Sequence, residues 1–214
     1  MKRFRNRREA GQRLAAELGV YRNRPEVIVL ALPRGGVPVA YEVAQALNAP
    51  LDVFIVRKLG LIGHEELAVG AIASGGVRVL NPEIVAYWEV SVEELDAITR
   101  REESELIRRE QEYREGQPFP DLRNRTVILV DDGLATGATM RAAVQAVKLQ
   151  YPQQVIVAVP AAAPETCESF RSLVDDIICA ITPEPFQAVG LWYEDFSQTT
   201  DAEVKDLLRR ASRG

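Results

Sequence analysis

The chain has 214 residues, of which 47% are hydrophobic and 27% are charged, and its formal net charge is −5. These values are ordinary for a soluble globular protein, and the length suits one α/β domain with a subdomain or two small domains. The acidic balance argues against a surface built for broad contact with nucleic acid. We therefore expect a single domain over residues 1–214 that binds no nucleic acid.

The start of the chain and its cysteines carry no targeting or metal signal. Residues 1–8 are basic, but no apolar run follows them, so we expect no signal peptide. No stretch approaches the roughly 18 apolar residues of a membrane helix, which predicts a cytoplasmic protein without membrane contact. Cys167 and Cys179 are too far apart for a CxxC pair, and we expect two reduced thiols in the interior.

Strand and helix patterns alternate along the chain. A capping pair, Asn6 and Glu9, predicts a first helix. Apolar runs predict buried strands, and the segments after four of them are typical of helices. The alternation predicts a doubly wound, mainly parallel five-stranded sheet with flanking helices. The predicted strands are 27–32, 52–56, 126–130, 155–159 and 177–181, and the later helices are 39–47, 138–150, 164–174 and one from about 201.

Two predicted features interrupt this alternation between the second and third strands. Residues 59–66 form a glycine-punctuated loop, and 67–80 have the pattern of a hairpin turning at Ser74-Gly75-Gly76. Residues 82–116 predict a helical insertion, which Ser91 and Glu94 would cap. Its predicted apolar stripe is Leu95, Ile98, Leu106 and Tyr113, and its predicted solvent-side ion pairs are Glu105–Arg109 and Glu110–Arg114.

The sharpest motif is Val127-Ile128-Leu129-Val130-Asp131-Asp132-Gly133-Leu134-Ala135-Thr136-Gly137-Ala138-Thr139. Four apolar residues bury a strand, and two carboxylates stand at its end, where they can accept hydrogen bonds from a vicinal diol. A loop of small residues then precedes a helix, so backbone N–H groups and the helix N-terminus can bind an anion. This order favours a ligand with a diol at one end and a phosphate at the other. A chance acidic turn before a capped helix is the alternative.

The segment resembles the signature with which type I phosphoribosyltransferases bind 5-phosphoribosyl-1-pyrophosphate (PRPP). The resemblance implies that Asp131 and Asp132 hold the ribose hydroxyls. The residues that it assigns to the 5′-phosphate are Ala135, Thr136, Gly137, Ala138 and Thr139. It also implies transfer of ribose 5-phosphate from PRPP to a nitrogenous acceptor. Mg²⁺ would be carried by PRPP, with no metal bound directly by the chain.

Two further strand ends suit the leaving pyrophosphate. Arg34, Gly35 and Gly36 follow the first predicted strand, where an arginine fork can bind phosphate oxygens and glycines allow close backbone approach. Lys58 ends the second predicted strand and is similar to a basic residue that several family members direct at pyrophosphate. The alternatives are an ordinary strand-to-helix turn and a solvated charge. We count Arg34 and Lys58 with Asp131 and Asp132 as the candidate catalytic residues.

Residues 59–80 resemble the mobile lid of the family, and His64, the only histidine, is a candidate for proton handling there. A solvent-facing histidine is the alternative. Residues 183–197 are a candidate hood, where Trp192 and Tyr193 could stack on a planar base or pack a subdomain. The insertion 82–116 could be a hood, a dimer contact or both, and a homodimer is the expected assembly. A PRPP-binding regulator without catalysis is the alternative function.

Overall fold

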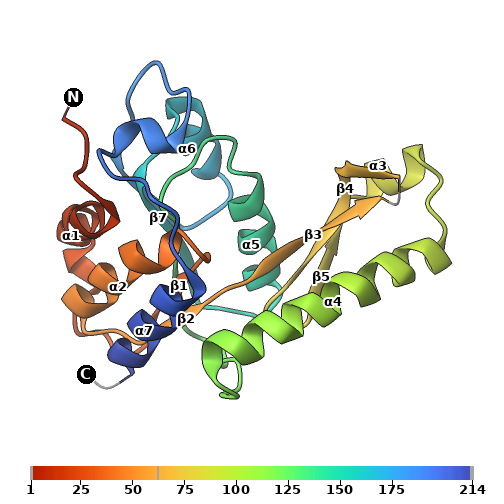
Figure 1. Ribbon diagram of the computed structural model, residues 1–214, viewed down its shortest axis with the longest axis horizontal. Helices are drawn as coiled ribbons and strands as arrows, with labels where there is room; N and C mark the ends of the chain where they lie inside the picture. The colour runs from red at the N-terminus through yellow and green to blue at the C-terminus, as the bar shows by residue number, and fades with distance from the viewer. Residues whose placement is uncertain (1, 62, 213–214) are drawn as a thin grey trace.

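The computed structural model describes residues 2–61 and 63–212 (Figure 1). Ile62, which falls in the predicted loop 59–66, lies outside the described residues, as do Met1, Arg213 and Gly214. The helices are α1 (Arg7–Glu17), α2 (Gly36–Leu47), α3 (Pro82–Tyr87), α4 (Val92–Arg114), α5 (Ala138–Lys148), α6 (Pro164–Phe170) and α7 (Asp201–Ala211), with 3-10 turns at Gly19–Tyr21 and Val189–Trp192. The strands are β1 (Val27–Ala31), β2 (Leu51–Val53), β3 (Val56–Leu61), β4 (His64–Ala73), β5 (Val77–Leu80), β6 (Thr126–Val130), β7 (Gln154–Ala161) and β8 (Asp176–Ile181). Within the described ranges, no helix has the length and apolar character to cross a membrane.

Five strands form one parallel sheet in the order β2-β1-β6-β7-β8, which confirms the predicted doubly wound fold. β1 and β6 pair in register from Val27 opposite Thr126 to Ala31 opposite Val130. Chain order is β1, β2, β6, β7, β8, so the direction of winding reverses between β1 and β6. Ligands of open α/β sheets bind beyond the carboxyl ends of the strands at such a reversal. The fold therefore directs attention to the loops after β1 and β6.

Successive residues of the central strands alternate between two hydrophobic cores. On β1, Val27 and Val29 belong to the core that contains side chains of α1, α2 and α7. Ile28 and Leu30 belong to the core that contains side chains of α5 and α6. This period of two is the pleat of a strand, and both faces are apolar because helices cover both. The buried apolar runs in the sequence have this origin.

The second predicted strand is divided between two sheets, which corrects the expectation for 52–56. β2 ends at Val53, and the chain then leaves the parallel sheet to form β3 in an antiparallel sheet of order β3-β4-β5. Buried Ser74 stabilises this crossing, since its hydroxyl accepts a hydrogen bond from the Ile55 N–H at 2.9 Å. The predicted loop 59–66 is also corrected, because β3 continues to Leu61 and β4 begins at His64.

The strands β3–β5 and the helices α3 and α4 form an arm that projects from the core (Figure 1). The capping box between Ser91 and Glu94 is present, and the apolar stripe of α4 is buried as predicted. This stripe packs on the antiparallel sheet in the same core as Leu59 and Ile72. The predicted lid and the predicted insertion are therefore two layers of one arm.

A buried arginine fixes the base of the arm. Arg114, the last residue of α4, is 4% exposed and pairs with Asp52 of β2 at 3.0 Å and with Glu110 at 2.8 Å. Its Nη2 also donates to the Val53 carbonyl at 2.8 Å. The predicted Glu110–Arg114 pair is thus present, but its predicted place on the solvent side is wrong. The last turn of α4 packs against β2, and the charge is buried there.

The two cysteines form a disulfide, so the expectation of two reduced thiols is wrong. Cys167 lies on α6 and Cys179 on β8, with Cα atoms 6.8 Å apart and a sequence separation of 12. The 12 residues cover the end of α6, the connection after it and the first part of β8. The bond therefore ties α6 to the sheet.

The predicted hood lies against the beginning of the chain. Phe4 forms a parallel bridge with Tyr193, and the Phe4 N–H donates to the Trp192 carbonyl at 2.9 Å. The Glu194 N–H donates to the Phe4 carbonyl at 2.8 Å. Phe4 and Tyr193 share a small third core with Ile181 of β8. The hood is therefore held by the segment that leads into α1.

Candidate functional site

The loops after β1 and β6 touch at the point where the winding reverses. A Cβ atom on Gly35 would lie 2.1 Å from Asp132 Oδ2, and one on Gly36 would lie 2.7 Å from the Val130 carbonyl oxygen. Gly35 has a φ of −60°, which any residue can adopt, so the contact alone requires glycine there. The peptide bond between Pro33 and Arg34 is cis. The structure thus brings the predicted pyrophosphate loop against the predicted ribose-binding acids.

Both acids stand at the carboxyl end of β6, half-buried. Asp131 Oδ1 accepts a hydrogen bond from the Asp132 N–H at 2.8 Å, which turns the chain at the end of the strand. Asp132 Oδ2 accepts from Arg7 Nε at 2.9 Å, and Arg7 Nη2 lies 2.9 Å from the same oxygen. No side chain in the described part of the protein donates to Asp132 Oδ1. That oxygen remains available to a hydroxyl.

Burial and mutual repulsion dominate the electrostatics of the pair. Burial raises the pKa of Asp131 well above its usual value, and the neighbouring charge of Asp132 raises it further. Burial also raises the pKa of Asp132, while the charge and hydrogen bond of Arg7 act in the opposite direction. Strongly perturbed carboxylates at a sheet edge are characteristic of functional sites.

Arg7 is the residue of this site that the sequence did not reveal. It is the first residue of α1 and lies 125 positions from Asp132. Its Nη1 donates to the Ser197 carbonyl at 2.7 Å, and its guanidinium carbon lies 4.0 Å from the centre of the Phe196 ring. The only signal in the sequence was the basic character of residues 1–8, which does not single out one arginine.

The small-residue loop leads into α5 as predicted. Gly137 is the N-cap, with φ 72°, a left-handed conformation that glycine adopts most readily. Ala135, Thr136, Ala138 and Thr139 are exposed, and Gly137 is buried. Within residues 2–61 and 63–212, the N–H groups of Ala135, Thr136, Gly137 and Thr139 have no hydrogen-bond acceptor. Free N–H groups at the start of a helix form a site for an anion such as phosphate.

Helix α6 supports this loop from behind. Thr166 donates its hydroxyl hydrogen to the Ala135 carbonyl at 2.6 Å. A Cβ on Gly137 would lie 2.7 Å from the Phe170 ring and 3.0 Å from the Thr166 methyl group. Arg141 of α5 donates to the Ser169 hydroxyl at 2.7 Å. The disulfide therefore links β8 to α6, the helix that contacts this loop directly.

Arg34 lies in the loop after β1, but its side chain turns away from the acids. Its Nη1 lies 3.9 Å from Asp201 Oδ2 at the start of α7. Asp201 also accepts a hydrogen bond from the Tyr113 hydroxyl of α4. With Arg108, Arg109 and Glu112 these residues line a small cavity of about 140 Å³. Contact between Arg34 and a pyrophosphate at the acids stays a prediction.

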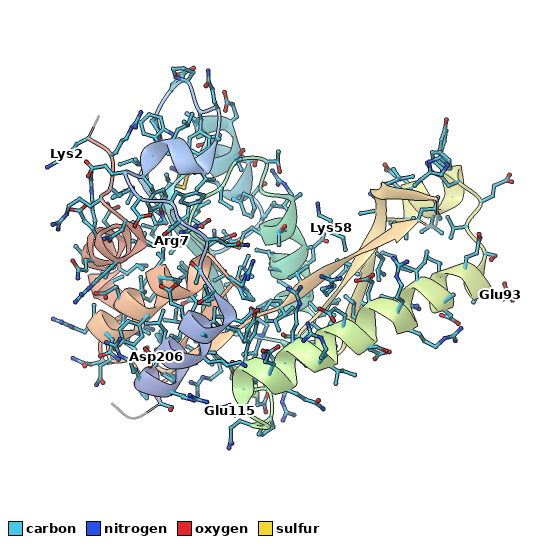
Figure 2. The ribbon with its side chains drawn as sticks, in the orientation of Figure 1. Lys2, Arg7, Lys58, Glu93, Glu115 and Asp206 are labelled. Carbon is cyan, nitrogen blue, oxygen red and sulfur yellow. A yellow bond between two sulfur atoms is a disulfide. The ribbon has the colours of Figure 1, made fainter. Side chains whose placement is uncertain are left out.

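Lys58 lies within β3, so its predicted place at the end of a core strand is wrong, because β2 already ends at Val53. Figure 2 shows Lys58 where the arm passes α5. Lys58 lines a groove of about 690 Å³ together with Ala138 and Thr139, and it forms no ion pair within the described ranges. The structure therefore brings Lys58, by way of the arm, to the groove beside the start of α5.

His64 and the two hood aromatics differ in exposure. His64 is exposed at the start of β4, and its ring centre lies 4.9 Å from that of Trp88 in the arm. Trp192 is half-buried and stacks with Phe186 at 6.3 Å. Tyr193 is 3% exposed, and its hydroxyl donates to the Asp132 carbonyl at 2.6 Å. Tyr193 therefore supports the acid pair, and its ring is not open to a base in this structure.

The described residues contain no cluster of three or more histidine, cysteine, aspartate or glutamate side chains arranged to hold a metal ion.

Comparison with known proteins identifies the family. The family described as "Phosphoribosyl transferase domain" matches residues 55–193. The Mycobacterium tuberculosis H37Rv protein named "Putative phosphoribosyl transferase Rv0571c" is 45% identical over 213 residues, which is all of this chain but 48% of that protein. The chain thus spans about half the length of the curated relatives that it matches.

Two solved structures extend the comparison. TT1426 from Thermus thermophilus is 41% identical, with a TM-score of 0.85, over 97% of this chain and 98% of that one. AQ2163 from Aquifex aeolicus, at 14% identity and a TM-score of 0.52, covers 94% of this chain and 84% of that one and shows the shared fold. The acids after β6, the loop that opens α5 and these matches lead to one conclusion: the chain belongs to the phosphoribosyl transferase domain family.

Proposed function

We propose that the chain transfers ribose 5-phosphate from Mg²⁺-PRPP to a nitrogenous acceptor and releases pyrophosphate. One observation carries the proposal. An acid pair, a glycine loop in contact with it and a loop with free N–H groups lie together at the reversal point of the sheet. PRPP presents a diol, a pyrophosphate and a 5′-phosphate, which are the three groups that such an edge can bind.

Binding of the sugar phosphate follows from the free donors and acceptors. Asp131 and Asp132 would accept hydrogen bonds from the two ribose hydroxyls, with Asp132 Oδ1 as the open acceptor. The free N–H groups of Ala135, Thr136, Gly137 and Thr139, at the positive end of α5, would bind the 5′-phosphate. These contacts fix the ribose ring between its hydroxyl and phosphate ends, so C1 is held in place for reaction.

The chemical step breaks the bond between C1 and the pyrophosphate oxygen as an acceptor nitrogen bonds to C1. The bonding pair leaves with pyrophosphate, and the proton that the acceptor nitrogen loses passes to solvent. Mg²⁺, brought by PRPP, neutralises pyrophosphate charge when bound. Arg34 and Lys58 would add positive charge, and the N–H groups near Gly35 and Gly36 would add donors. Catalysis then rests on positioning and electrostatics.

The arm and the hood complete the proposal. The segment 59–80 would cover the bound substrate with His64 near its tip, and exclusion of water would protect PRPP from hydrolysis. Trp192 would contribute to the acceptor side of the site. The same chemistry accommodates ring nitrogens and amines as acceptors.

The test uses the full chain with Mg²⁺-PRPP and a mixture of nitrogenous metabolites. Calorimetry measures PRPP binding, and mass spectrometry detects new ribose 5-phosphate adducts. Asp131→Asn combined with Asp132→Asn is expected to abolish both signals, while Asp206→Asn, on the exposed face of α7, leaves them unchanged. Binding without any adduct or pyrophosphate release would favour a regulator that senses PRPP. Absence of PRPP binding by the unaltered chain would refute the proposal.

A further inference from the structure

Arg7, which Figure 2 labels, connects three distant parts of the chain. From α1, its Nε and Nη2 both lie 2.9 Å from Asp132 Oδ2. Its Nη1 donates to the carbonyl of Ser197, the last residue of the hood, at 2.7 Å. Every nitrogen of the guanidinium is therefore engaged, and the arginine side chain is 12% exposed. This is a fixed fork and not a mobile surface charge.

The surroundings of Asp132 leave its carboxylate little freedom. The fork contacts one oxygen, and Gly35 packs so closely on that oxygen that no side chain fits. The Tyr193 hydroxyl holds the Asp132 carbonyl from the hood at 2.6 Å. The Phe196 ring covers the guanidinium at 4.0 Å. Only the second carboxylate oxygen is free of side-chain donors within the described part of the chain.

We propose that Arg7 is a positioning residue that orients the Asp132 carboxylate so that its free oxygen accepts a ribose hydroxyl of PRPP. This inference rests on the proposed function. Arg7 lies outside residues 55–193, the range that the family model matches. Its effect passes through Asp132, and Arg7 need not touch the substrate.

The charged groups around Asp132 determine the pH at which its carboxylate ionises. The groups that face it are Asp131 on the same strand end, Arg7 from α1 and Tyr193 from the hood, while Asp195 faces Arg7. Arg34, from the loop after β1, turns toward Asp201 instead. Burial disfavours the ionised form of Asp132, and Arg7 is the only one of these groups that favours it. Without Arg7, Asp132 would ionise only at a higher pH.

The test measures Mg²⁺-PRPP affinity by calorimetry from pH 5.5 to pH 9 for the unaltered chain and three variants. Arg7→Met should weaken PRPP binding about 10- to 100-fold at neutral pH. The difference in affinity from the unaltered chain should become smaller as the pH rises, because Asp132 then ionises without Arg7. Arg7→Lys keeps the charge without the fork, so it should recover part of the affinity and a near-normal pH profile. Arg8→Met is the matched control, because Arg8 is exposed on the same helix and pairs with Glu42 away from the acids.

Each contrary outcome has a distinct meaning. Unchanged affinity and pH profile in Arg7→Met would overturn the inference and leave the proposed function intact. If Arg7→Met loses the same amount of PRPP affinity at every pH, and Arg7→Lys loses as much, the inference is overturned. Arg7 would then be a purely structural contact. If Arg7→Met does not fold, the Arg7→Lys profile alone decides, since a full loss at every pH contradicts orientation through charge. Failure of the unaltered chain to bind PRPP would remove the proposed function and this inference with it.

Discussion

Replacement of Gly35 by alanine isolates the contact between the two loops of the site. The backbone at Gly35 has a φ of −60°, so alanine introduces no conformational strain and would itself stabilise the fold by about 0.4–1 kcal/mol through the unfolded state. The new methyl group would lie 2.1 Å from Asp132 Oδ2 and 2.8 Å from its Cγ. The carboxylate must retreat by about 1 Å to reach an ordinary contact distance.

That displacement lengthens the 2.9 Å contacts between Arg7 and Asp132 beyond hydrogen-bonding range. Loss of a charged hydrogen bond costs about 1.5–3 kcal/mol, so the net free energy of unfolding should fall by about 1–2 kcal/mol. A fall of this size lowers the melting temperature by about 2–8 °C in a chain of this length. A displaced Asp132 also loses its hydrogen bond to the ribose hydroxyl, and at about 1.5–3 kcal/mol for a charged group PRPP affinity should fall roughly 10- to 100-fold.

Calorimetry with Mg²⁺-PRPP and thermal unfolding followed by circular dichroism measure both effects. Gly19→Ala is the matched control, because a Cβ there meets no atom within 4 Å. In an Asp132→Ala background the obstructing carboxylate is absent. Gly35→Ala should then cause no further loss of PRPP affinity or melting temperature. Wild-type affinity and melting temperature in the single variant would refute the reasoning, and so would an equal loss in the two backgrounds.

Four further changes test other contacts. Asp131→Asn should weaken PRPP binding and raise the melting temperature at neutral pH, because the raised pKa of Asp131 means that its ionised form destabilises the fold. The difference in melting temperature between the variant and the unaltered chain should shrink as the pH falls toward about 4, where the acid is protonated in the unfolded chain too. Thr166→Val removes the hydrogen bond to Ala135 and should weaken PRPP binding about fivefold by calorimetry. Arg114→Met leaves Asp52 unpaired and should lower the free energy of unfolding in urea by about 3–5 kcal/mol. Reduction of the disulfide should lower it by about 3 kcal/mol, measured in urea with and without reductant.

The parallel sheet and the acid pair could be predicted because their signals are local. The strands at residues 27–32 and 126–130 are apolar on both faces, and polar or glycine residues follow at once. Carboxyl ends of parallel strands share one edge, so the glycines after β1 and the acids after β6 had to lie near each other. Topology then set them at the reversal point.

The remaining features depend on partners that the local sequence does not specify. Gly60 is typical of a loop, yet it pairs with Ala68 of β4, with register shifts on both sides of it, while Gly63 lies in the turn between the two strands. Arg7 joins the site through a contact that spans 125 positions, and one arginine among several at the start of the chain has no distinguishing neighbour. The disulfide follows from the packing of α6 on β8, which a spacing of 12 residues does not reveal.

The hydrogen bond between Arg7 and the carbonyl of Ser197 spans 190 positions. Two segments that are synthesised at very different times are therefore in direct contact in the folded chain. During synthesis α1 emerges well before the hood that receives it, and the sheet strands emerge between the two. Closing so long a loop has an entropic cost that only the finished sheet can offset. Asp132 therefore gains its final environment only after the hood has been made, and a nascent chain would form strands of the sheet before the acid pair has all its contacts.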